Sequence, residues 1–424
     1  MTQIDNPIPR TAGTGGSALV HRCQVCGSGD LRPVLFIGYL PPVNTMSPIG
    51  SRPDAQPAYP AEMLRCDRCT LVQLGLIVDP SIIFPPHYAY TSGTTRILRD
   101  NFAQMYTEVM ERFPLTATDL IVDIGSNDGT LLGNFHRGGH RVVGVEPTNA
   151  CRIAIAAGIT TVNAFFSRET ARAVKAEHGG AKLVTACNVF AHIEDVHGVV
   201  DGIVDLLAAD GVFISESHYL MPLLETLQYD TIYHEHLRYY SLTSLSYLLG
   251  MHGLEVVHAR PIPTHGGSIR VYAARRGAHT VSPDVARILA AEAAALTPER
   301  LAEFRRRVSQ SKLDLMAMLR DVRKDGAGVY AIGAPSRAST LINYVGLDDA
   351  ILDCVLEIAG SYKIGKYMPG TLIPVLDEAR LLEDQPEYAL LLSWHIGDEL
   401  AAKLRSAGYR GRFIVPLPTP RILA

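Results

Sequence analysis

The chain has 424 residues, 47 % of them hydrophobic, and a formal net charge of −4. This length can bury more than one hydrophobic core and predicts two to four domains. A mildly acidic chain gives no general electrostatic reason to bind nucleic acid or an anionic membrane. The sequence holds no run of about 18 apolar residues and no signal-peptide layout, so we expect a cytoplasmic protein without a membrane partner.

The N-terminal part of the chain carries two CxxC pairs. Residues 1–20 are rich in Gly, Thr and Pro and are predicted to be disordered. Within residues 21–80, each CxxC pair can direct two thiolates at one point, and two pairs complete a tetrahedral cage whose usual occupant is Zn²⁺. Four protein ligands leave no open position, so a structural site is expected. Four buried or redox-active cysteines are the alternative. The predicted ligands are Cys23, Cys26, Cys66 and Cys69.

An α/β pattern follows, and we assign residues 81–280 to it. A connector with a turn at Ser92-Gly93 leads into a helical segment. Short apolar strands then alternate with helices, which predicts a parallel, doubly wound sheet. The helix that begins after "FAHIED" is predicted to stop at Gly211. The predicted strands contain "LIVDIGSND", "RVVGVEPT", "KLVTACNVFAHIED" and "VFISES".

Two further segments complete the predicted architecture. Residues 281–325 are rich in Ala, Leu, Glu and Arg with helical spacing, which predicts long bridging helices. After Gly326 the alternation of strands and helices restarts, so residues 326–424 are predicted to form a second α/β domain.

Acidic and glycine residues gather where the first strands of the α/β pattern end. Asp123 and Gly125 close the first strand, and Glu146 closes the second, where an acid can bind both ribose hydroxyls of a nucleoside. The glycine pattern is Gly125-Ser-Asn-Asp-Gly129 rather than GxGxxG. A phosphate-free nucleoside is therefore favoured over NAD.

This pattern resembles the first motif, E/DxGxxxG, of the class I S-adenosylmethionine-dependent methyltransferases. The resemblance implies an α/β fold with a Rossmann-like core and S-adenosylmethionine as cofactor. The cofactor-binding residues that it implies are Asp123, Gly125, Asn127, Asp128, Glu146, Pro147, Asn188 and His192.

A narrower resemblance covers nearly the whole chain, from Cys23 to about Pro416. The chain resembles the nucleotide-sugar C-methyltransferases that build branched deoxysugars. This implies a zinc-binding N-terminal domain, a methyltransferase core and a C-terminal Rossmann-like domain, with the active site between them. The motifs, in chain order, are CxxC…CxxC, "YAYTSGTT", "VDIGSNDGTLL", "GVEPT", "CNVFAHIED", "YDTIYHEHLRYYS", "HGGSIRVY" and "GAPSRAST".

Carbon methylation requires a base, because a C–H proton must leave before the carbon can attack the methyl group. In a 4-ketohexose the carbonyl acidifies the proton at C3. The position of His236 in the family motif makes it the expected base, and a histidine accepts a proton near pH 7. His234 and Glu235 remain alternatives.

Tyrosines are expected to assist this base. Tyr233, like Glu235, is predicted to orient or hydrogen-bond, and Tyr90 to donate a hydrogen bond to the enolate oxygen, with Tyr88 less favoured. A metal site built on residues 234–236 is a rival interpretation, and so is a solvated surface loop.

Basic and small residues nearer the C-terminus suggest where a diphosphate binds. Arg270, in "THGGSIR", could meet an anion, although this segment also reads as a hairpin turn. Ser336 and Arg337 lie at a strand-to-helix junction, where helix N-termini attract phosphate. Lys363 would add positive charge, and an ordinary capped helix is the alternative.

We therefore expect a methyltransferase that acts at C3 of a dTDP-4-keto-deoxysugar. An O- or N-methyltransferase of another small metabolite is one alternative, and a nucleic-acid-binding zinc protein with a methyltransferase-like domain is another. A dehydrogenase built on the C-terminal domain is weak, because "AIGAPSR" lacks the dinucleotide fingerprint. No nucleic-acid partner is expected, and a monomer is plausible because three domains can cover one another.

Overall fold

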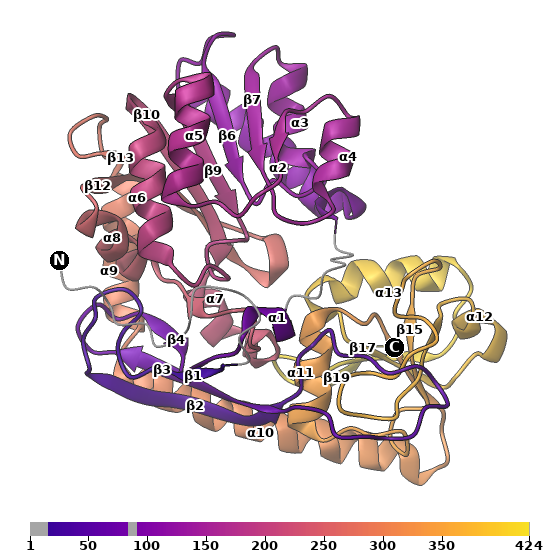
Figure 1. Cartoon of the computed structure of the whole chain (residues 1–424). Coiled ribbons are helices and arrows are strands. Elements are labelled where there is room, and N and C mark those ends of the chain that lie inside the picture. The colour runs from indigo at the N-terminus through magenta and orange to yellow at the C-terminus, as the bar shows by residue number, and fades with distance from the viewer. Residues whose placement is uncertain (1–15, 84–90, 424) are drawn as a thin grey trace.

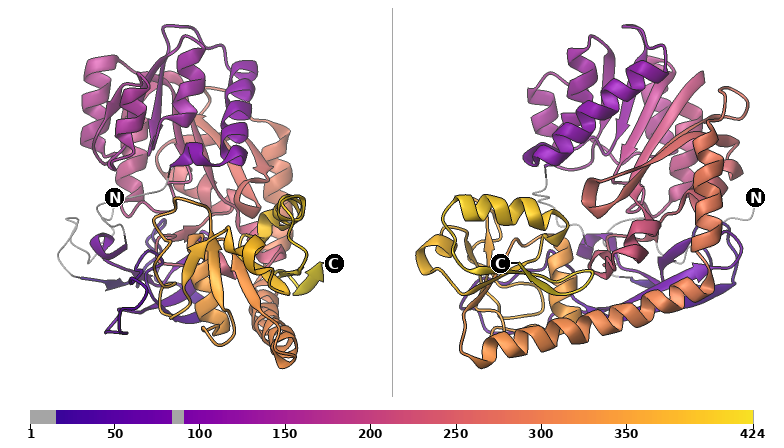
Figure 2. Two further views of the ribbon diagram at one scale, coloured as in Figure 1. Left: turned by 90° about the vertical axis from the view of Figure 1, so that its right-hand side faces the viewer. Right: turned by 180° about the vertical axis from the view of Figure 1, so that it is seen from behind.

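The protein is described here by a computed structural model that places residues 16–83 and 91–423. Tyr88, Tyr90 and most of the N-terminal segment predicted to be disordered lie outside the described residues. Three bodies are visible, an upper α/β domain, a lobe at the lower left and a second α/β domain at the lower right (Figure 1). The long helix α10 (Pro298–Lys324) joins the upper domain to the lower right one along the base of the molecule (Figure 2).

The N-terminal lobe is a four-stranded antiparallel sheet of order β11-β4-β3-β2. One edge strand, β11, comes from the middle of the chain, directly after the "YDTIYHEH" segment. The lobe is therefore not a separate N-terminal unit. The strands are β2 (Leu31–Leu40), β3 (Tyr59–Cys66), β4 (Val72–Leu74) and β11 (Arg238–Tyr239); β1 (Ala18–Leu19) pairs with β5 (Leu76–Ile77), and α1 (Pro80–Ile83) follows.

The upper domain contains a seven-stranded sheet of order β12-β13-β10-β9-β6-β7-β8. The predicted parallel sheet is correct for six strands and wrong for β13, which runs antiparallel to both neighbours. The connection from β12 to β13 spans only residues 263–267, and so short a link can only reverse the chain. The strands are β6 (Leu120–Ile124), β7 (Arg141–Val145), β8 (Thr161–Val162), β9 (Ala181–Cys187), β10 (Leu207–His218), β12 (Leu254–Ile262) and β13 (Ser268–Arg275).

Helices cover both faces of this sheet (Figure 1). The predicted helix end at Gly211 is wrong, because α6 ends at Leu206 and β10 begins at Leu207. Leu207 pairs with Ala181 of β9, so tertiary pairing overrides the local helical pattern. The helices are α2 (Arg96–Arg112), α3 (Thr130–Arg137), α4 (Cys151–Ala156), α5 (Arg168–His178), α6 (Val196–Leu206), α7 (Leu220–Glu225), α8 (Leu242–Met251) and α9 (Pro283–Ala295).

Helices α9 and α10 occupy most of the segment that was predicted to form bridging helices. The buried face of α10 repeats at three- and four-residue spacing, which places one stripe against β2, α7 and α11. Thr297 caps its first turn by accepting a hydrogen bond from the backbone N–H of Arg300. The stripe consists of Leu301, Phe304, Val308, Ser311, Leu315, Leu319 and Val322.

The C-terminal domain has a six-stranded sheet of order β16-β15-β14-β17-β18-β19, parallel except for β19. This confirms the second α/β pattern. The elements are β14 (Val329–Ile332), α11 (Ser336–Val345), β15 (Cys354–Glu357), β16 (Val375–Asp377), α12 (Arg380–Asp384), β17 (Tyr388–Leu391), α13 (Gly397–Ser406), β18 (Arg412–Val415) and β19 (Arg421–Leu423).

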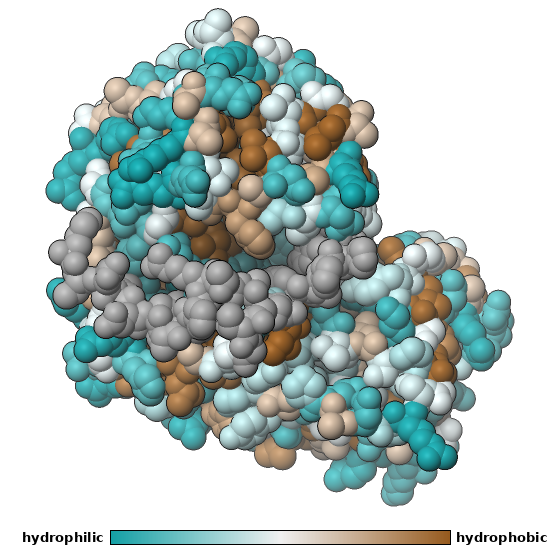
Figure 3. All heavy atoms as spheres, in the orientation of Figure 1, coloured by the Kyte–Doolittle hydropathy of each residue, from teal (hydrophilic) through white to brown (hydrophobic). Residues whose placement is uncertain are grey.

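Two hydrophobic cores tie the three bodies together. One contains β2 of the lobe, α10 and the C-terminal sheet, and the other joins the cysteine knuckles to the upper domain. On the face shown in Figure 3, hydrophobic side chains form small scattered groups among hydrophilic ones. None of the helices within the described residues is long and apolar enough to cross a membrane.

Candidate active site

The four CxxC cysteines form one cluster. All four Sγ atoms lie within 4.8 Å of one another, and the Cys23–Cys69 and Cys26–Cys66 Sγ pairs are 3.4 and 3.5 Å apart. A tetrahedral zinc with bonds of about 2.3 Å would hold its sulfurs about 3.8 Å apart, so the donor set fits Zn²⁺. The cluster is enclosed by protein and offers no open position, which fits a structural role.

Two carboxylates end adjacent strands at the carboxyl edge of the seven-stranded sheet. Asp123 is 4 % exposed and accepts a hydrogen bond of 2.6 Å from Thr185, and burial raises its pKa to about 7. Glu146 follows β7, and its two oxygens accept backbone N–H bonds from Asn127 and Thr148. Gly125, between them, has φ +68°, and an added Cβ would lie 2.5 Å from Val189. An acidic edge of this kind suits a cationic nucleoside without phosphates, such as S-adenosylmethionine.

Asn127 and Asp128 serve the loop before α2 in this structure. Asn127 Oδ1 accepts the backbone N–H of Ser92 at 2.9 Å, and Asp128 Oδ2 accepts that of Gly93 at 2.7 Å. These bonds hold Ser92 and Gly93 against the carboxyl edge of the sheet. Pro147 is half-buried beside Glu146.

The "YDTIYHEH" segment, which we call the base loop (residues 229–236) after the base predicted in it, places His236 in a group of neighbouring rings, which we call the histidine cluster (His192, His218, His236 and His265). The Nδ1 atom of His236 is 2.8 Å from the carbonyl oxygen of Thr231. A carbonyl can only accept, so Nδ1 carries the proton and Nε2 keeps its lone pair. The Tyr233 ring lies 4.2 Å from the His236 ring, and the His192 ring lies 5.0 Å away.

The neighbouring residues of the base loop face other partners. His234 is 3 % exposed, lies 3.3 Å from the carbonyl oxygen of Pro60 and packs edge-on against Tyr59. Glu235 accepts a hydrogen bond of 2.7 Å from Asn44 of the lobe, and burial raises its pKa to about 7. His234 is thus turned toward the lobe, whereas His236 lies in the histidine cluster. Within the described residues, the four-cysteine cluster is the metal-ligating group, not the base loop.

The C-terminal domain holds the base loop from the opposite side. Asp230, fully buried, accepts two hydrogen bonds from Arg337, at 2.7 and 2.9 Å, and one of 2.7 Å from Trp394 Nε1. The Arg337 guanidinium also stacks over the Trp394 ring. Arg337, predicted to bind a substrate anion, has its charge paired within the protein in this structure.

Asn188 is a predicted residue, whereas His218, His265 and His395, which lie in or beside the histidine cluster, were not predicted from the sequence. Asn188, with φ +59°, follows β9 and donates its backbone N–H to the carbonyl of Glu216. The His218 ring lies 5.9 Å from the His236 ring, and His218 Nε2 meets the carbonyl of His265 at 2.9 Å. Arg337 lies 3.1 Å from Nδ1 of His395. The "THGG" motif flagged the neighbourhood of His265, but isolated histidines at strand ends carry no periodic signal.

Burial keeps the histidines of this cluster neutral near pH 7. Burial lowers the pKa of His236 well below its ordinary value, and the neighbouring His192 and His218 lower it further. Burial likewise lowers the pKa of His192 to about 4 and that of His218 to about 3. Near neutral pH these rings therefore carry lone pairs rather than charges, as a base requires.

Acid should destabilise the fold through these rings. His265, whose pKa is lowered to about 4 by burial and by Arg337, takes up a proton near pH 6.5 only after unfolding. Stability should therefore fall as pH drops from about 6.5 toward 4, since the unfolded state binds more protons there. His265→Asn, which suits the backbone φ of +56°, should flatten this slope by close to one proton in urea titrations. Identical slopes would contradict the assignment.

The remaining predicted substrate residues divide into two groups. Arg270 is fully buried and binds Glu216 at 2.5 Å and Glu108 at 2.7 Å, so it has no free face for a substrate anion, which corrects the expectation from the sequence. Arg270 lies on β13, the second strand of the β12–β13 hairpin. Its hydrogen bond to Asn101 Oδ1 links the sheet to α2. Ser336 begins α11, and Lys363 donates to the carbonyl of Ala334, two residues before Ser336.

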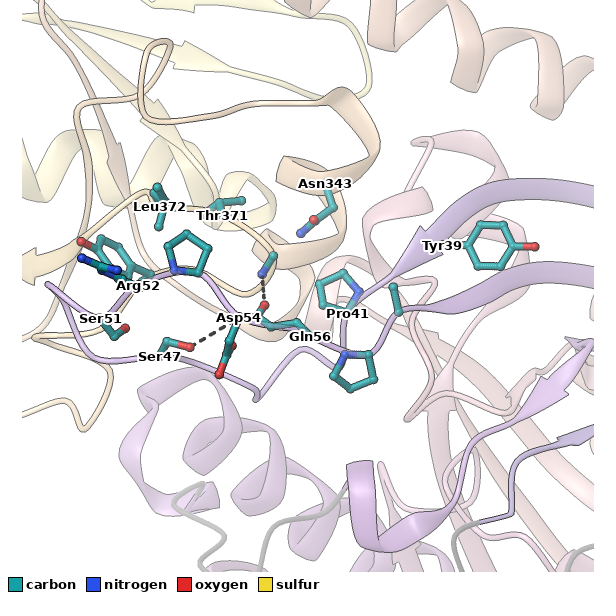
Figure 4. Close-up of a pocket in the computed structure, with 15 residues that line it drawn as sticks. Tyr39, Pro41, Ser47, Ser51, Arg52, Asp54, Gln56, Asn343, Thr371 and Leu372 are labelled. Carbon is teal, nitrogen blue, oxygen red and sulfur yellow. Dashed lines mark hydrogen bonds between the residues drawn. The ribbon is translucent and has the colours of Figure 1, made fainter.

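A separate hollow of about 540 Å³ lies between the 47–58 segment and the C-terminal domain (Figure 4). Gln56 spans it, accepting from the backbone N–H of Gly370 at 3.3 Å and donating to Ser47 at 3.1 Å. None of the residues of the histidine cluster lines this hollow. Its labelled residues are Tyr39, Pro41, Ser47, Ser51, Arg52, Asp54, Gln56, Asn343, Thr371 and Leu372.

The strand order, the acidic carboxyl edge and the cysteine cage together define a zinc-binding, S-adenosylmethionine-dependent methyltransferase of class I fold. Residues 23–84 match a zinc binding domain, residues 97–259 a methyltransferase domain, and residues 263–418 the C-methyltransferase C-terminal domain. The chain is 36 % identical over 412 residues to the C-methyltransferase NovU of Streptomyces niveus, covering 96 % of this chain and 97 % of that protein. The chain belongs to this family of three-part C-methyltransferases.

Solved methyltransferases resemble a smaller part of the chain. A methyltransferase from Anabaena variabilis is 15 % identical, with 42 % of this chain and 95 % of that chain covered and a TM-score of 0.32. The magnesium protoporphyrin IX methyltransferase of Synechocystis PCC 6803, solved with bound S-adenosylmethionine, is 14 % identical, with 42 % and 79 % covered and a TM-score of 0.32.

Proposed function

We propose that this enzyme methylates C3 of a dTDP-linked 4-keto-deoxysugar, with His236 as the base. The observation that carries the proposal is the hydrogen bond from His236 Nδ1 to the Thr231 carbonyl, which leaves Nε2 as a proton acceptor. Bound S-adenosylmethionine supplies the methyl group.

In the proposed reaction, His236 Nε2 takes the proton from the carbon next to the ketone. The electron pair of the broken C–H bond delocalises onto the ketone oxygen and then forms the new C–C bond, as the bond between sulfur and methyl breaks. Tyr233 packs against His236 and orients it, and Tyr90 is proposed to donate a hydrogen bond to the developing enolate oxygen. Glu235, bonded to Asn44, holds the loop toward the lobe rather than acting as the base.

The cofactor is proposed to lie on the acidic edge formed by Asp123 and Glu146, with Asn188 and His192 beside the methyl group. Asn127 and Asp128 then shape this edge by holding the loop at Ser92 and Gly93. The nucleotide diphosphate is proposed to lie on the C-terminal domain beside Ser336 and Lys363, because Ser336 begins α11 and Lys363 donates to the carbonyl of Ala334, two residues before it. Family membership supports carbon methylation over the O- or N-methyl alternative.

The test is to incubate the enzyme with a dTDP-4-keto-6-deoxysugar in deuterium oxide and to locate label and methyl group by NMR. With S-adenosylmethionine we expect a C3-methyl product, and with S-adenosylhomocysteine we expect deuterium at C3. A methyl group on oxygen or nitrogen would overturn the proposal. Label and methyl at C5, on the other side of the ketone, would correct the carbon while leaving the base chemistry intact.

A further inference from the structure

The strand that follows the base loop belongs to the sheet of the zinc-binding lobe. Strand β11 begins two residues after His236 and pairs antiparallel with β4 of the lobe, with Arg238 opposite Gln73. The Gln73 side chain accepts the backbone N–H of Gln24 at 2.8 Å, and Gln24 directly follows the ligand Cys23. A continuous path of backbone pairing and one buried side chain thus runs from the first cysteine knuckle to the base loop.

The Arg238 side chain continues this path to the segment that follows His192. Arg238 is 2 % exposed and donates to the backbone carbonyls of Ile193 and, at 2.8 Å, Glu194. These carbonyls come directly after His192, whose ring lies 5.0 Å from that of His236. The backbone N–H of Leu237 adds a bond of 2.9 Å to the Ala191 carbonyl. One arginine therefore joins the segment of His192 to the segment of His236.

The charge of Arg238 suits its position beside the cysteine cage. Burial lowers the pKa of Arg238, whereas the nearby Tyr240 group and, after it, the Cys23 group favour the charged form. Four thiolates around Zn²⁺ carry a net charge of −2, so a buried cation beside them offsets part of that charge. A neutral residue at position 238 would lose this attraction as well as the two bonds to carbonyls.

We propose that the zinc-binding lobe positions the catalytic base, and that Arg238 is the positioning residue which transmits the lobe's location to both His236 and His192. This inference rests on the proposed function only in naming His236 as the base. On this view the zinc site shapes the active site from a distance, beyond stabilising its own lobe.

A second contact between lobe and upper domain provides a matched control. His197 Nε2 meets the carbonyl of Val25, inside the first CxxC, at 2.8 Å, and His197 Nδ1 meets His252 at 2.8 Å. His252 in turn lies 2.8 Å from Asp201. This chain also fastens the lobe to the upper domain, but none of these contacts reaches the base loop.

The experiment compares Arg238→Met, Arg238→Lys and His197→Gln in the full-length zinc-loaded enzyme. Arg238→Met should lower kcat about tenfold or more, because small misplacements of reacting groups are costly, with KM for S-adenosylmethionine changed less than about twofold. Arg238→Lys, which can still donate to one carbonyl, should recover part of kcat and keeps the test available if Arg238→Met fails to fold. His197→Gln should keep kcat near wild type.

Two further measurements separate this inference from the proposed reaction. Zinc content should stay at one ion per chain in all three variants. Backbone hydrogen exchange, read by mass spectrometry without substrate, should accelerate in residues 188–195 and 229–240 for Arg238→Met but not for His197→Gln. Unchanged exchange in Arg238→Met, or an equal loss of kcat in His197→Gln, overturns the inference even if no sugar is turned over.

Discussion

Replacing His236 with asparagine is expected to lower turnover by about 10²- to 10⁴-fold, the usual contribution of a general base. Asparagine can keep a hydrogen bond to the Thr231 carbonyl, which His236 bonds at 2.8 Å, but its amide cannot take a proton from carbon near pH 7. Cofactor affinity should hardly change, because the predicted cofactor residues belong to other segments of the chain and Asn at position 236 keeps the local hydrogen bond. Steady-state kinetics and calorimetric titration with S-adenosylmethionine measure the two effects separately.

The matched control for this variant is His234→Asn. His234 is two residues away, but its ring faces Tyr59 and the Pro60 carbonyl in the lobe. We expect it to keep most of the wild-type turnover, at some cost in stability. Deuterium wash-in at the substrate carbon should disappear in His236→Asn and persist in His234→Asn. The reverse pattern would assign the base to His234.

The second large effect is expected for Arg337→Met. This change leaves the Asp230 carboxylate, which has no exposed surface, with Trp394 as its remaining side-chain partner. Breaking a buried ion pair by removing one partner typically costs about 3–5 kcal/mol. Because Asp230 belongs to the base loop, kcat should fall along with the free energy of unfolding. Urea unfolding and kinetics of the same preparation would measure both.

Two comparisons show whether the loss comes from the unpaired charge. The double variant Asp230→Asn/Arg337→Met removes both charges and should be more stable than Arg337→Met alone. Arg380→Met breaks an exposed pair with Asp384 in the same domain and should change stability little. A double variant no more stable than Arg337→Met would mean that packing against Trp394, rather than charge, dominates.

The base loop is where the three parts of the chain meet. Glu235 bonds Asn44 of the lobe, Asp230 bonds Arg337 of the C-terminal domain, and Leu237, directly after the loop, bonds Ala191 of the methyltransferase domain. The position of His236 therefore depends on how the three bodies are arranged. If His236 is the base, as proposed, residues far from it are expected to influence turnover.

Local sequence was sufficient wherever a short stretch contains all the information. The CxxC pairs predicted the cysteine cage, the strand-end residues Asp123 and Glu146 predicted the acidic edge, and helical spacing predicted α9 and α10. These features depend on residue type and on spacing along one element. The crowding of ionisable groups in "YDTIYHEH" likewise singled out the segment that the structure places between the three parts of the chain.

Contacts between distant residues were decided only by the tertiary structure. Arg270 and Arg337 read as free cations in the sequence, yet each meets carboxylates from another segment, because a buried charge must be paired. The sequence around residues 218 and 395 carries no signal, and the "THGG" motif at residue 265 does not indicate that these histidines lie near His236. The surroundings of His234 and His236 were also not readable from the sequence, since the Pro60 carbonyl beside the His234 ring belongs to a distant segment. Residue chemistry thus follows from sequence, while the partner of each side chain follows from packing.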